Sequence, residues 1–174
     1  MKKFIIALMF TFLPTLIFAQ SAFEKYEDRP EITSVIVTKK MFQLMGEMKL
    51  DAKDKDAQQY LNLVKKLENL KVFTTESAKY SKDMKATVDT YLKAHPLDEL
   101  MRINDGGNSV KIFVKSGATA SQVKELLMFV DGTGPKNNTV LLSLTGSFDL
   151  ADLSVLTDKM NLPGGKELKK AAKK

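Results

Sequence analysis

The 174-residue chain contains no cysteine, and this absence excludes several arrangements at once. Without cysteine there is no disulfide, no cysteine nucleophile and no lipid-bearing cysteine behind a leader sequence. Without disulfides, the apolar core alone has to stabilise the fold.

Histidine is almost as scarce, because His95 is the single one in the chain. It precedes Pro96, and no serine or carboxylate motif accompanies it. The sequence also lacks a G-x-S-x-G elbow, an H-E-x-x-H helix, a P-loop and a G-x-G-x-x-G loop. A lone histidine at the end of a helix typically interacts with the last carbonyl groups of that helix. We therefore expect a protein that is not an enzyme, with no catalytic residues and no cofactor.

The N-terminus has the pattern of a secretory signal. Lys2 and Lys3 precede an apolar core, residues 4–18, and the small residue Ala19 follows it. This order predicts a signal peptide over residues 1–19 that is cleaved after Ala19, and hence a periplasmic or secreted protein. The apolar run is shorter than the roughly 20 residues of a spanning helix, and no later segment reaches that length. No transmembrane segment is expected once the signal is removed.

The rest of the chain divides into a single α+β domain, residues 20–162, and a basic flexible tail, residues 163–174. The tail begins at a Pro-Gly-Gly break, and residues 159–174 hold six lysines and one acidic residue. The formal net charge of +6 therefore belongs mainly to the two ends, and the folded body is close to neutral. The tail is either solvated or in contact with anionic lipid. Nucleic acid is not an expected partner, because the chain lacks a platform of basic and aromatic residues.

Hydrophobic periodicity predicts an α+β fold with a mainly antiparallel sheet. The expected sheet has a four-strand C-terminal meander plus two N-terminal strands, with helices packed on one face. The two N-terminal strands are separated by helices and are candidates for parallel neighbours through a right-handed crossover. The expected strands cover residues 32–37, 70–75, 100–104, 110–114, 126–130 and 139–145, and the expected helices follow Thr38, begin near Ala57, span 77–94 and follow Gly146.

Two groups of residues invite a metal-binding hypothesis. Asp51, Asp54 and Asp56 resemble a calcium loop, but the glycine and the glutamate that such a loop needs are missing, so we expect acids at a helix start. Met41, Met45 and Met48 share one predicted helical face, and thioethers are ligands that suit Cu(I). Core packing is the expected role of these methionines. No metal site is predicted.

Several segments of the chain carry a resemblance, namely residues 23–26, 33–42, 70–76, 125–130 and 141–153. Together they resemble a domain-of-unknown-function family of short exported Bacteroidota proteins, and the resemblance covers nearly all of the mature chain. It implies a location in a Gram-negative envelope. The family has no settled activity, so the resemblance transfers no catalytic or binding residues. Some relatives are lipoproteins, whereas this chain lacks the cysteine that lipid attachment needs.

The side of the sheet opposite the helices is expected to carry an apolar patch. If Val110, Ile112 and Val114 face the helices, alternation turns Phe113 away from them, and it likewise turns Leu141 away from them. A patch around Phe113 and Leu141 predicts contact with a second subunit, an unknown envelope protein or a covering segment such as the one around Phe23 and Tyr26. The preferred function is a protein-interaction module of unknown specificity; the alternative is a periplasmic module that binds a small molecule or a metal.

Overall fold

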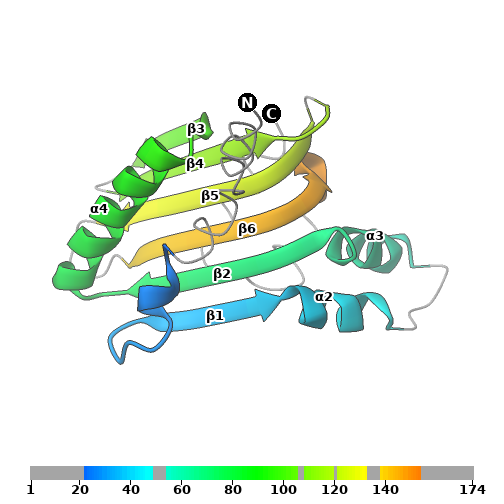
Figure 1. Ribbon diagram of the computed structural model, residues 1–174, viewed down its shortest axis with the longest axis horizontal. Coiled ribbons are helices and arrows are strands. Elements are labelled where there is room, and N and C mark those ends of the chain that lie inside the picture. The colour runs from blue at the N-terminus through cyan, green and yellow to red at the C-terminus, as the bar shows by residue number, and fades with distance from the viewer. Residues whose placement is uncertain (1–21, 49–53, 106–107, 120, 133–137, 154–174) are drawn as a thin grey trace, which may run out of the picture.

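The computed structural model describes residues 22–48, 54–105, 108–119, 121–132 and 138–153, and it contains one six-stranded antiparallel sheet (Figure 1). The strand order is β1-β2-β6-β5-β4-β3. The α+β class and the antiparallel C-terminal meander, β3 to β6, are confirmed. The strands are β1 (Thr33–Thr38), β2 (Leu67–Thr75), β3 (Asp98–Asp105), β4 (Asn108–Ser116), β5 (Gln122–Gly132) and β6 (Thr139–Asp149). The helices are α2 (Lys39–Gly46), α3 (Lys55–Val64) and α4 (Ala78–Ala94), with single 3-10 turns η2 (Glu24–Tyr26) and η3 (Leu150–Asp152).

The two N-terminal strands are antiparallel neighbours, so the predicted parallel crossover is wrong. Thr33 pairs with Thr74 at one end of the β1–β2 ladder, and Thr38 pairs with Asn69 at the other. Helix α2 continues directly from β1, and α3 returns alongside it to β2 (Figure 1). Because the two helices form a hairpin, they reverse the chain, whereas a single crossover helix would have restored its direction.

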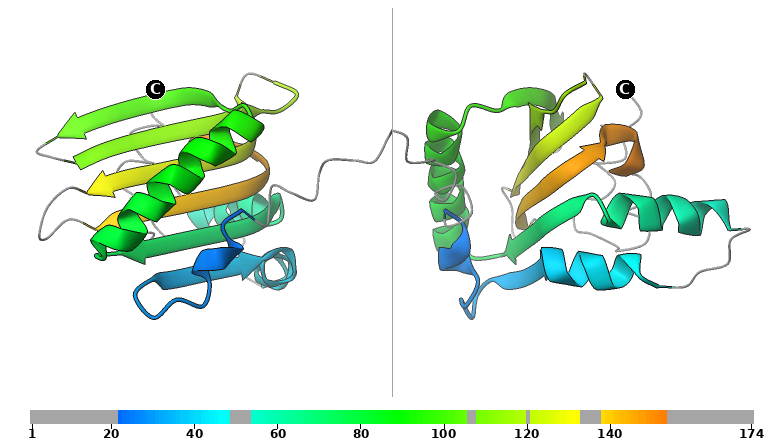
Figure 2. Two further views of the ribbon diagram at one scale, coloured as in Figure 1. Left: turned by 60° about the vertical axis from the view of Figure 1, so that its left-hand side comes forward. Right: turned by 45° about the vertical axis from the view of Figure 1, so that its right-hand side comes forward.

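The sheet buries a separate apolar cluster on each face. Helix α4 crosses one face diagonally (Figure 2), where Met84, Val88 and Tyr91 cover the side chains of Phe73, Leu127 and Phe129. Phe42 of α2 and Leu63 and Val64 of α3 belong to the cluster on the opposite face, together with alternate residues of β2, β4, β5 and β6. The helices are thus divided between the two faces rather than gathered on one.

Phe113 and Leu141 are buried, which corrects the prediction that they lie on an exposed outer face. Phe113 is 8% exposed and Leu141 is fully buried, and both belong to the cluster beneath α4. The alternation itself is as expected, since Val110, Ile112 and Val114 point to the other face. The helix α4 packs on the Phe113 side, however, and Phe23 and Tyr26 fill the rest of this layer. A second subunit, an envelope protein and a covering segment were the expected partners of these residues. In the structure they are covered by the chain itself, through α4 and the segment with Phe23 and Tyr26.

Turn η2 is fixed to α4 by Tyr26. Its side chain is buried, and its hydroxyl donates to Asp83 Oδ2 at 2.7 Å and lies 2.8 Å from Thr87 Oγ1. Lys25 Nζ also contacts Asp83 Oδ2 at 2.7 Å. Burial raises the pKa of Tyr26, so the hydroxyl stays protonated and remains a donor. The first described residues of the chain therefore form an integral part of the α4 layer.

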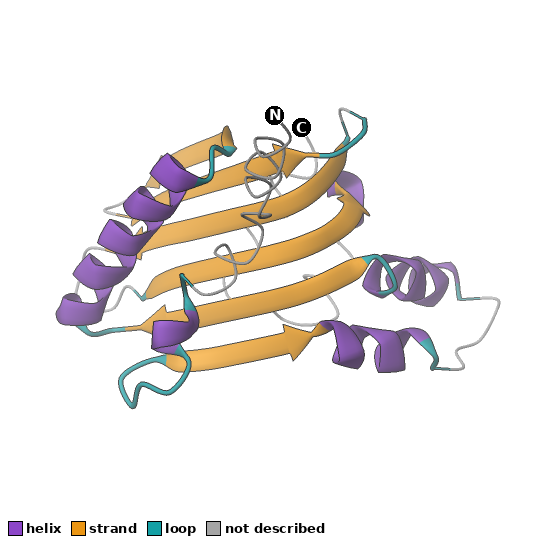
Figure 3. Cartoon of the chain, viewed as in Figure 1, coloured by secondary structure: helices purple, strands orange, loops and turns teal. Residues whose placement is uncertain are grey.

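The chain extends further in β6 than expected before it turns. The helix predicted to follow Gly146 does not begin there, because residues 146–149 still belong to β6. The 3-10 turn η3 follows at Leu150 (Figure 3). Gly146 allows a close approach, since a Cβ atom there would lie 2.4 Å from the carbonyl oxygen of Lys66. The amide of Ser147 donates to the same oxygen at 2.9 Å. The remainder of the predicted helix, residues 1–19 and the tail lie outside the described residues.

Candidate functional site

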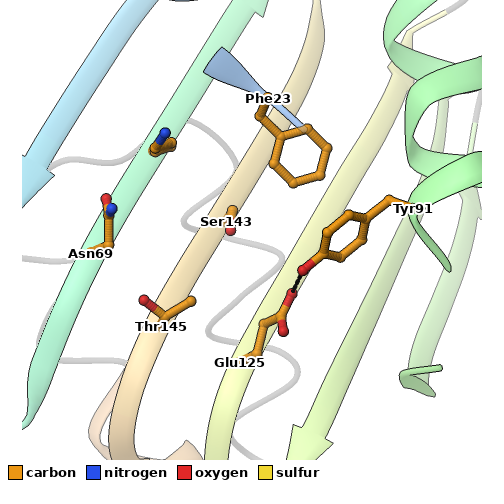
Figure 4. Close-up of a pocket in the computed structure, with 7 residues that line it drawn as sticks. Phe23, Asn69, Tyr91, Glu125, Ser143 and Thr145 are labelled. Carbon is orange, nitrogen blue, oxygen red and sulfur yellow. Dashed lines mark hydrogen bonds between the residues drawn. The ribbon is translucent and has the colours of Figure 1, made fainter. Parts of the chain in front are cut away.

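The face of the sheet that carries α4 changes from apolar to polar along its central strands. Asn69 of β2 lies opposite Thr145 of β6, and Thr145 lies opposite Glu125 of β5. One step along the strands, Lys71 lies opposite Ser143. We call this site the polar recess; it is lined by Phe23, Asn69, Lys71, Tyr91, Glu125, Ser143 and Thr145 and has a volume of about 30 Å³ (Figure 4).

One wall of the polar recess is aromatic. The Tyr91 hydroxyl, which comes from α4, donates to Glu125 Oε1 at 2.5 Å (Figure 4). Burial, and then the neighbouring Glu125 carboxylate, raise the pKa of Tyr91, which keeps this hydroxyl a donor. The ring of Phe23 lies beside that of Tyr91, with 5.0 Å between the ring centroids. Glu125 is only 9% exposed, so α4 and the N-terminal segment hold a carboxylate in a largely dry position.

A buried lysine stands at the other side of the recess. Lys71 is 8% exposed, and its Nζ lies 2.8 Å from Glu27 Oε1 and 3.8 Å from Glu24 Oε1. A buried ammonium needs such carboxylates, because its desolvation is otherwise too costly. The segment around η2 therefore supplies both the aromatic wall and the counter-charges of Lys71.

Two polar atoms of the recess floor have no partner. Asn69 Oδ1 and Thr145 Oγ1 are buried and make no hydrogen bond within the described part of the chain. An unpaired buried polar atom costs about 1–3 kcal/mol of stability. Both atoms lie in the same cross-strand row as Glu125. This row can accept hydrogen bonds from a small group that carries several N–H or O–H donors.

A second candidate site is apolar and lies at the edge of the sheet. Five of the six large hydrophobic side chains exposed among the described residues fall between positions 35 and 48. Val35 and Ile36 point to opposite faces of β1, because they pair with Val72 and Lys71 of β2. Within the described residues, no strand pairs with the outer edge of β1. We call this surface the β1–α2 edge; it consists of Val35, Ile36, Met41, Leu44 and Met48.

The core-packing prediction is wrong for Met41 and Met48. These side chains are 51% and 55% exposed, whereas Met45 is partly buried and Phe42 is completely buried. Helix α2 extends beyond the end of the strands (Figure 1), so only the side that carries Phe42 and Met45 reaches the cluster between helices and sheet. The described residues contain no group of three or more His, Cys, Asp or Glu side chains placed to hold a metal ion.

Two other predicted roles are structural. Asp54 caps α3, because its Oδ1 accepts from the amide of Ala57 at 3.0 Å, as expected for an acid at a helix start. His95 ends α4: its amide donates to the Tyr91 carbonyl at 2.8 Å, and its Nδ1 lies 3.3 Å from that oxygen. The imidazole also stacks on the Tyr91 ring with 4.4 Å between centroids. The predicted interaction of His95 with the helix terminus is confirmed.

The chain contains one Ser-x-x-Lys spacing, at Ser121 and Lys124. The structure places it at the start of β5 rather than on a helix. The Ser121 hydroxyl donates to Asp149 Oδ1 at 3.1 Å, and both Ser121 and Lys124 are exposed. The spacing therefore does not form a sheltered nucleophile with an adjacent base.

The polar recess was missed as a whole. The available signal was the run of polar side chains at alternate positions of otherwise apolar strands, Asn69 and Lys71 in one strand and Ser143 and Thr145 in another. Alternation places each pair on one face of its own strand. Only the register between strands shows that these pairs lie side by side with Glu125.

Comparison with known proteins gives one match. The family model described as Domain of unknown function (DUF4252) matches residues 26–156. No curated protein and no solved structure matches the chain. Among the described helices, none combines the length and the apolar character that crossing a membrane requires.

Proposed function

We propose that this chain, which belongs to the family described as Domain of unknown function (DUF4252), is a non-enzymatic protein-interaction module of the periplasm or the extracellular space. Its partner is a second copy of the chain, bound through the β1–α2 edge. The observation that carries this proposal is the concentration of exposed apolar side chains on that edge. Contiguous exposed apolar surface is uncommon on monomeric proteins and marks interaction sites.

The two edge strands of the sheet differ in a way that supports this proposal. Strand β3 contains Asp98, Glu99, Arg102 and Asp105, and charges of this kind prevent an edge from pairing with another chain. Strand β1 contains no charged residue and no proline. Within the described residues, one edge of the sheet is thus protected by charges and the other is open to strand addition.

A second copy is a suitable occupant of this edge. Two β1 strands paired antiparallel around a twofold axis extend a sheet that is already antiparallel throughout. Because the strand is uncharged, such a pair opposes no like charges. In this arrangement Met41, Leu44 and Met48 border the paired strands and add adaptable apolar contacts.

Sedimentation equilibrium tests this assembly. We expect the purified protein to form dimers at micromolar concentration and Ile36→Lys to be monomeric under the same conditions. Leu100→Lys is the matched control, because Leu100 lies on the other edge strand and is exposed to the same 39% as Ile36. A wild-type protein that stays monomeric at every concentration, or a Leu100→Lys variant that dissociates like Ile36→Lys, would overturn the proposal.

The proposed location of the module rests on its N-terminal sequence. Lys2 and Lys3, the apolar run and Ala19 support export followed by cleavage after Ala19. We expect the mass of the exported protein to correspond to a chain that begins at Gln20. Recovery of a mature protein that retains residues 1–18 would contradict this location.

A further inference from the structure

We propose that the polar recess binds the protonated primary amine of a small ligand. The site is separate from the β1–α2 edge, so this inference does not depend on self-association. It rests on four features of the recess: unpaired acceptor atoms, the Glu125 carboxylate, an aromatic wall and a small volume.

The acceptors lie in one row across the sheet. Asn69, Thr145 and Glu125 occupy neighbouring positions of β2, β6 and β5 (Figure 4). Asn69 Oδ1 and Thr145 Oγ1 have no hydrogen-bond partner among the described residues, and Glu125 receives one hydrogen bond from Tyr91. A primary ammonium group has three donors and no acceptor, which complements a row of this composition.

The charges around the recess favour a cation. The lining of the recess carries one carboxylate, that of Glu125, and one ammonium, that of Lys71, and the charge of Lys71 is compensated from outside the lining by Glu24 and Glu27. Lys71 is held by Glu24 and Glu27, which lie on the η2 side of the recess. Among the described residues, the Glu125 carboxylate is paired with a neutral phenol and not with a cation. A second ammonium beside Glu125 would compensate this largely buried charge.

The walls and the size narrow the class of ligand further. The rings of Phe23 and Tyr91 line the recess side by side, and aromatic rings attract ammonium groups. A volume of about 30 Å³ admits a single small head group and excludes a sugar or a nucleotide. Asn69, Ser143 and Thr145 remain partly exposed, so the head group has access from solvent. The rest of the ligand then stays outside the recess.

Backbone amide NMR of the purified protein tests the site, with methylammonium, 1,4-diaminobutane and an Nα-acetylated lysine amide as probes. Acetate and tetramethylammonium are the controls, since the first has the wrong charge and the second has no N–H donor. We expect the amine probes to shift the amides of Asn69, Glu125 and Thr145. Two heavy atoms limit methylammonium to millimolar affinity at best. The ratio of diaminobutane to lysine-amide affinity then separates a free amine from a lysyl side chain as the natural source.

Two substitutions remove the proposed contacts without enlarging the recess. Thr145→Val deletes the unpaired hydroxyl, and Glu125→Gln deletes the charge but keeps an acceptor for Tyr91. Each is expected to raise the dissociation constant for diaminobutane about tenfold or more, the effect of a single charge-assisted hydrogen bond. The matched controls Thr90→Val and Glu99→Gln make the same chemical changes at exposed positions and are expected to leave binding unchanged.

The same spectra show whether each variant is folded. If one of them is not, Asn69→Ala is tested in its place, because it removes the other unpaired acceptor of the recess. The proposal is overturned if the amine probes leave the recess amides unshifted at concentrations on the order of 100 mM, about a hundred times a millimolar dissociation constant. In that case the unpaired atoms of the recess would be satisfied by a bound water. Equal shifts with tetramethylammonium would also overturn it, because they would show attraction without recognition of the N–H donors.

Discussion

Replacement of Gly146 by alanine should separate the central strands at the end where β2 begins. A Cβ atom at this position would lie 2.4 Å from the Lys66 carbonyl oxygen and 2.9 Å from Leu67 Cα. Both neighbours are backbone atoms, so neither can move out of the way by a change of rotamer. The strand has to shift, and the hydrogen bond from the Ser147 amide to the Lys66 oxygen, now 2.9 Å long, is lost with it.

The expected cost is the sum of these two effects. Overpacking costs about 1–3 kcal/mol, and the lost hydrogen bond costs about 0.5–1.5 kcal/mol. Gly146→Ala should therefore lower the free energy of unfolding by about 1.5–4.5 kcal/mol, a large share of the 5–15 kcal/mol that is typical of a domain. Urea unfolding measures it as a shift of the midpoint at a constant slope.

Gly46→Ala is the matched control. The nearest atom to a Cβ there is Lys65 Cγ at 2.8 Å, which belongs to a flexible side chain that can move aside. Alanine also favours the helix by up to about 1 kcal/mol relative to glycine. We expect this variant to unfold within about 1 kcal/mol of the wild type. Equal effects of the two substitutions would refute the explanation from backbone proximity.

Three further predictions concern the α4 layer and the exposed edge. Phe113→Asp and Leu141→Asp bury an unpaired charge, and each should lower the free energy of unfolding, measured with heat or urea, by more than about 4 kcal/mol. A variant that stays stable but self-associates more weakly would show instead that these residues lie in an interface between subunits. The Lys25 ammonium, and then the Tyr26 hydroxyl, hold the pKa of Asp83 below its usual value, so this carboxylate stabilises the fold at neutral pH and the contribution disappears as the pH falls through the lowered pKa. Asp83 is about half exposed, so the contribution is under about 1 kcal/mol, and urea midpoints of wild type and Asp83→Asn between pH 7 and pH 3 should converge; parallel curves would contradict the assignment. Met41→Lys and Met48→Lys should each change the free energy of unfolding by under about 0.5 kcal/mol and should weaken dimerisation, as measured by sedimentation. A large loss of stability would show that these two side chains pack against the rest of the domain.

Much of the fold follows from local patterns in the sequence. Alternation in β4 and β6 and the apolar run in β5 predict the meander, and the 3.6-residue period together with Pro96 predicts α4 and its end. Alternation cannot decide which of two apolar faces a helix covers. Residues 126–130 are apolar on both sides, so the sequence did not show that α4 covers the face that carries Phe113 and Leu141.

Local patterns were also insufficient for α2. Periodicity predicts one apolar face with Met41, Met45 and Met48 over residues 41–48, and it does not show that the neighbouring Phe42 is the residue that packs into the core. The position of the helix beyond the strand ends decides in favour of Phe42. The polar recess could not be predicted for a related reason, because Asn69, Glu125 and Thr145 are distant in sequence and meet only through the strand register.

The strand order also governs when the chain can fold. Strand β6 is the last strand of the described chain, yet it lies in the middle of the sheet between β2 and β5. Until β6 is available, β1 and β2 form an isolated pair and β3 to β5 form another unit, with no hydrogen-bonded link between them. A pair of strands alone is marginally stable in water, and the joining of β2 to β6 closes a loop of about 70 residues, which makes it a slow step. During synthesis, which starts at the N-terminus, the sheet therefore cannot be completed until the chain has been made and released up to residue 149. Truncation before β6 should prevent folding rather than yield a smaller folded domain.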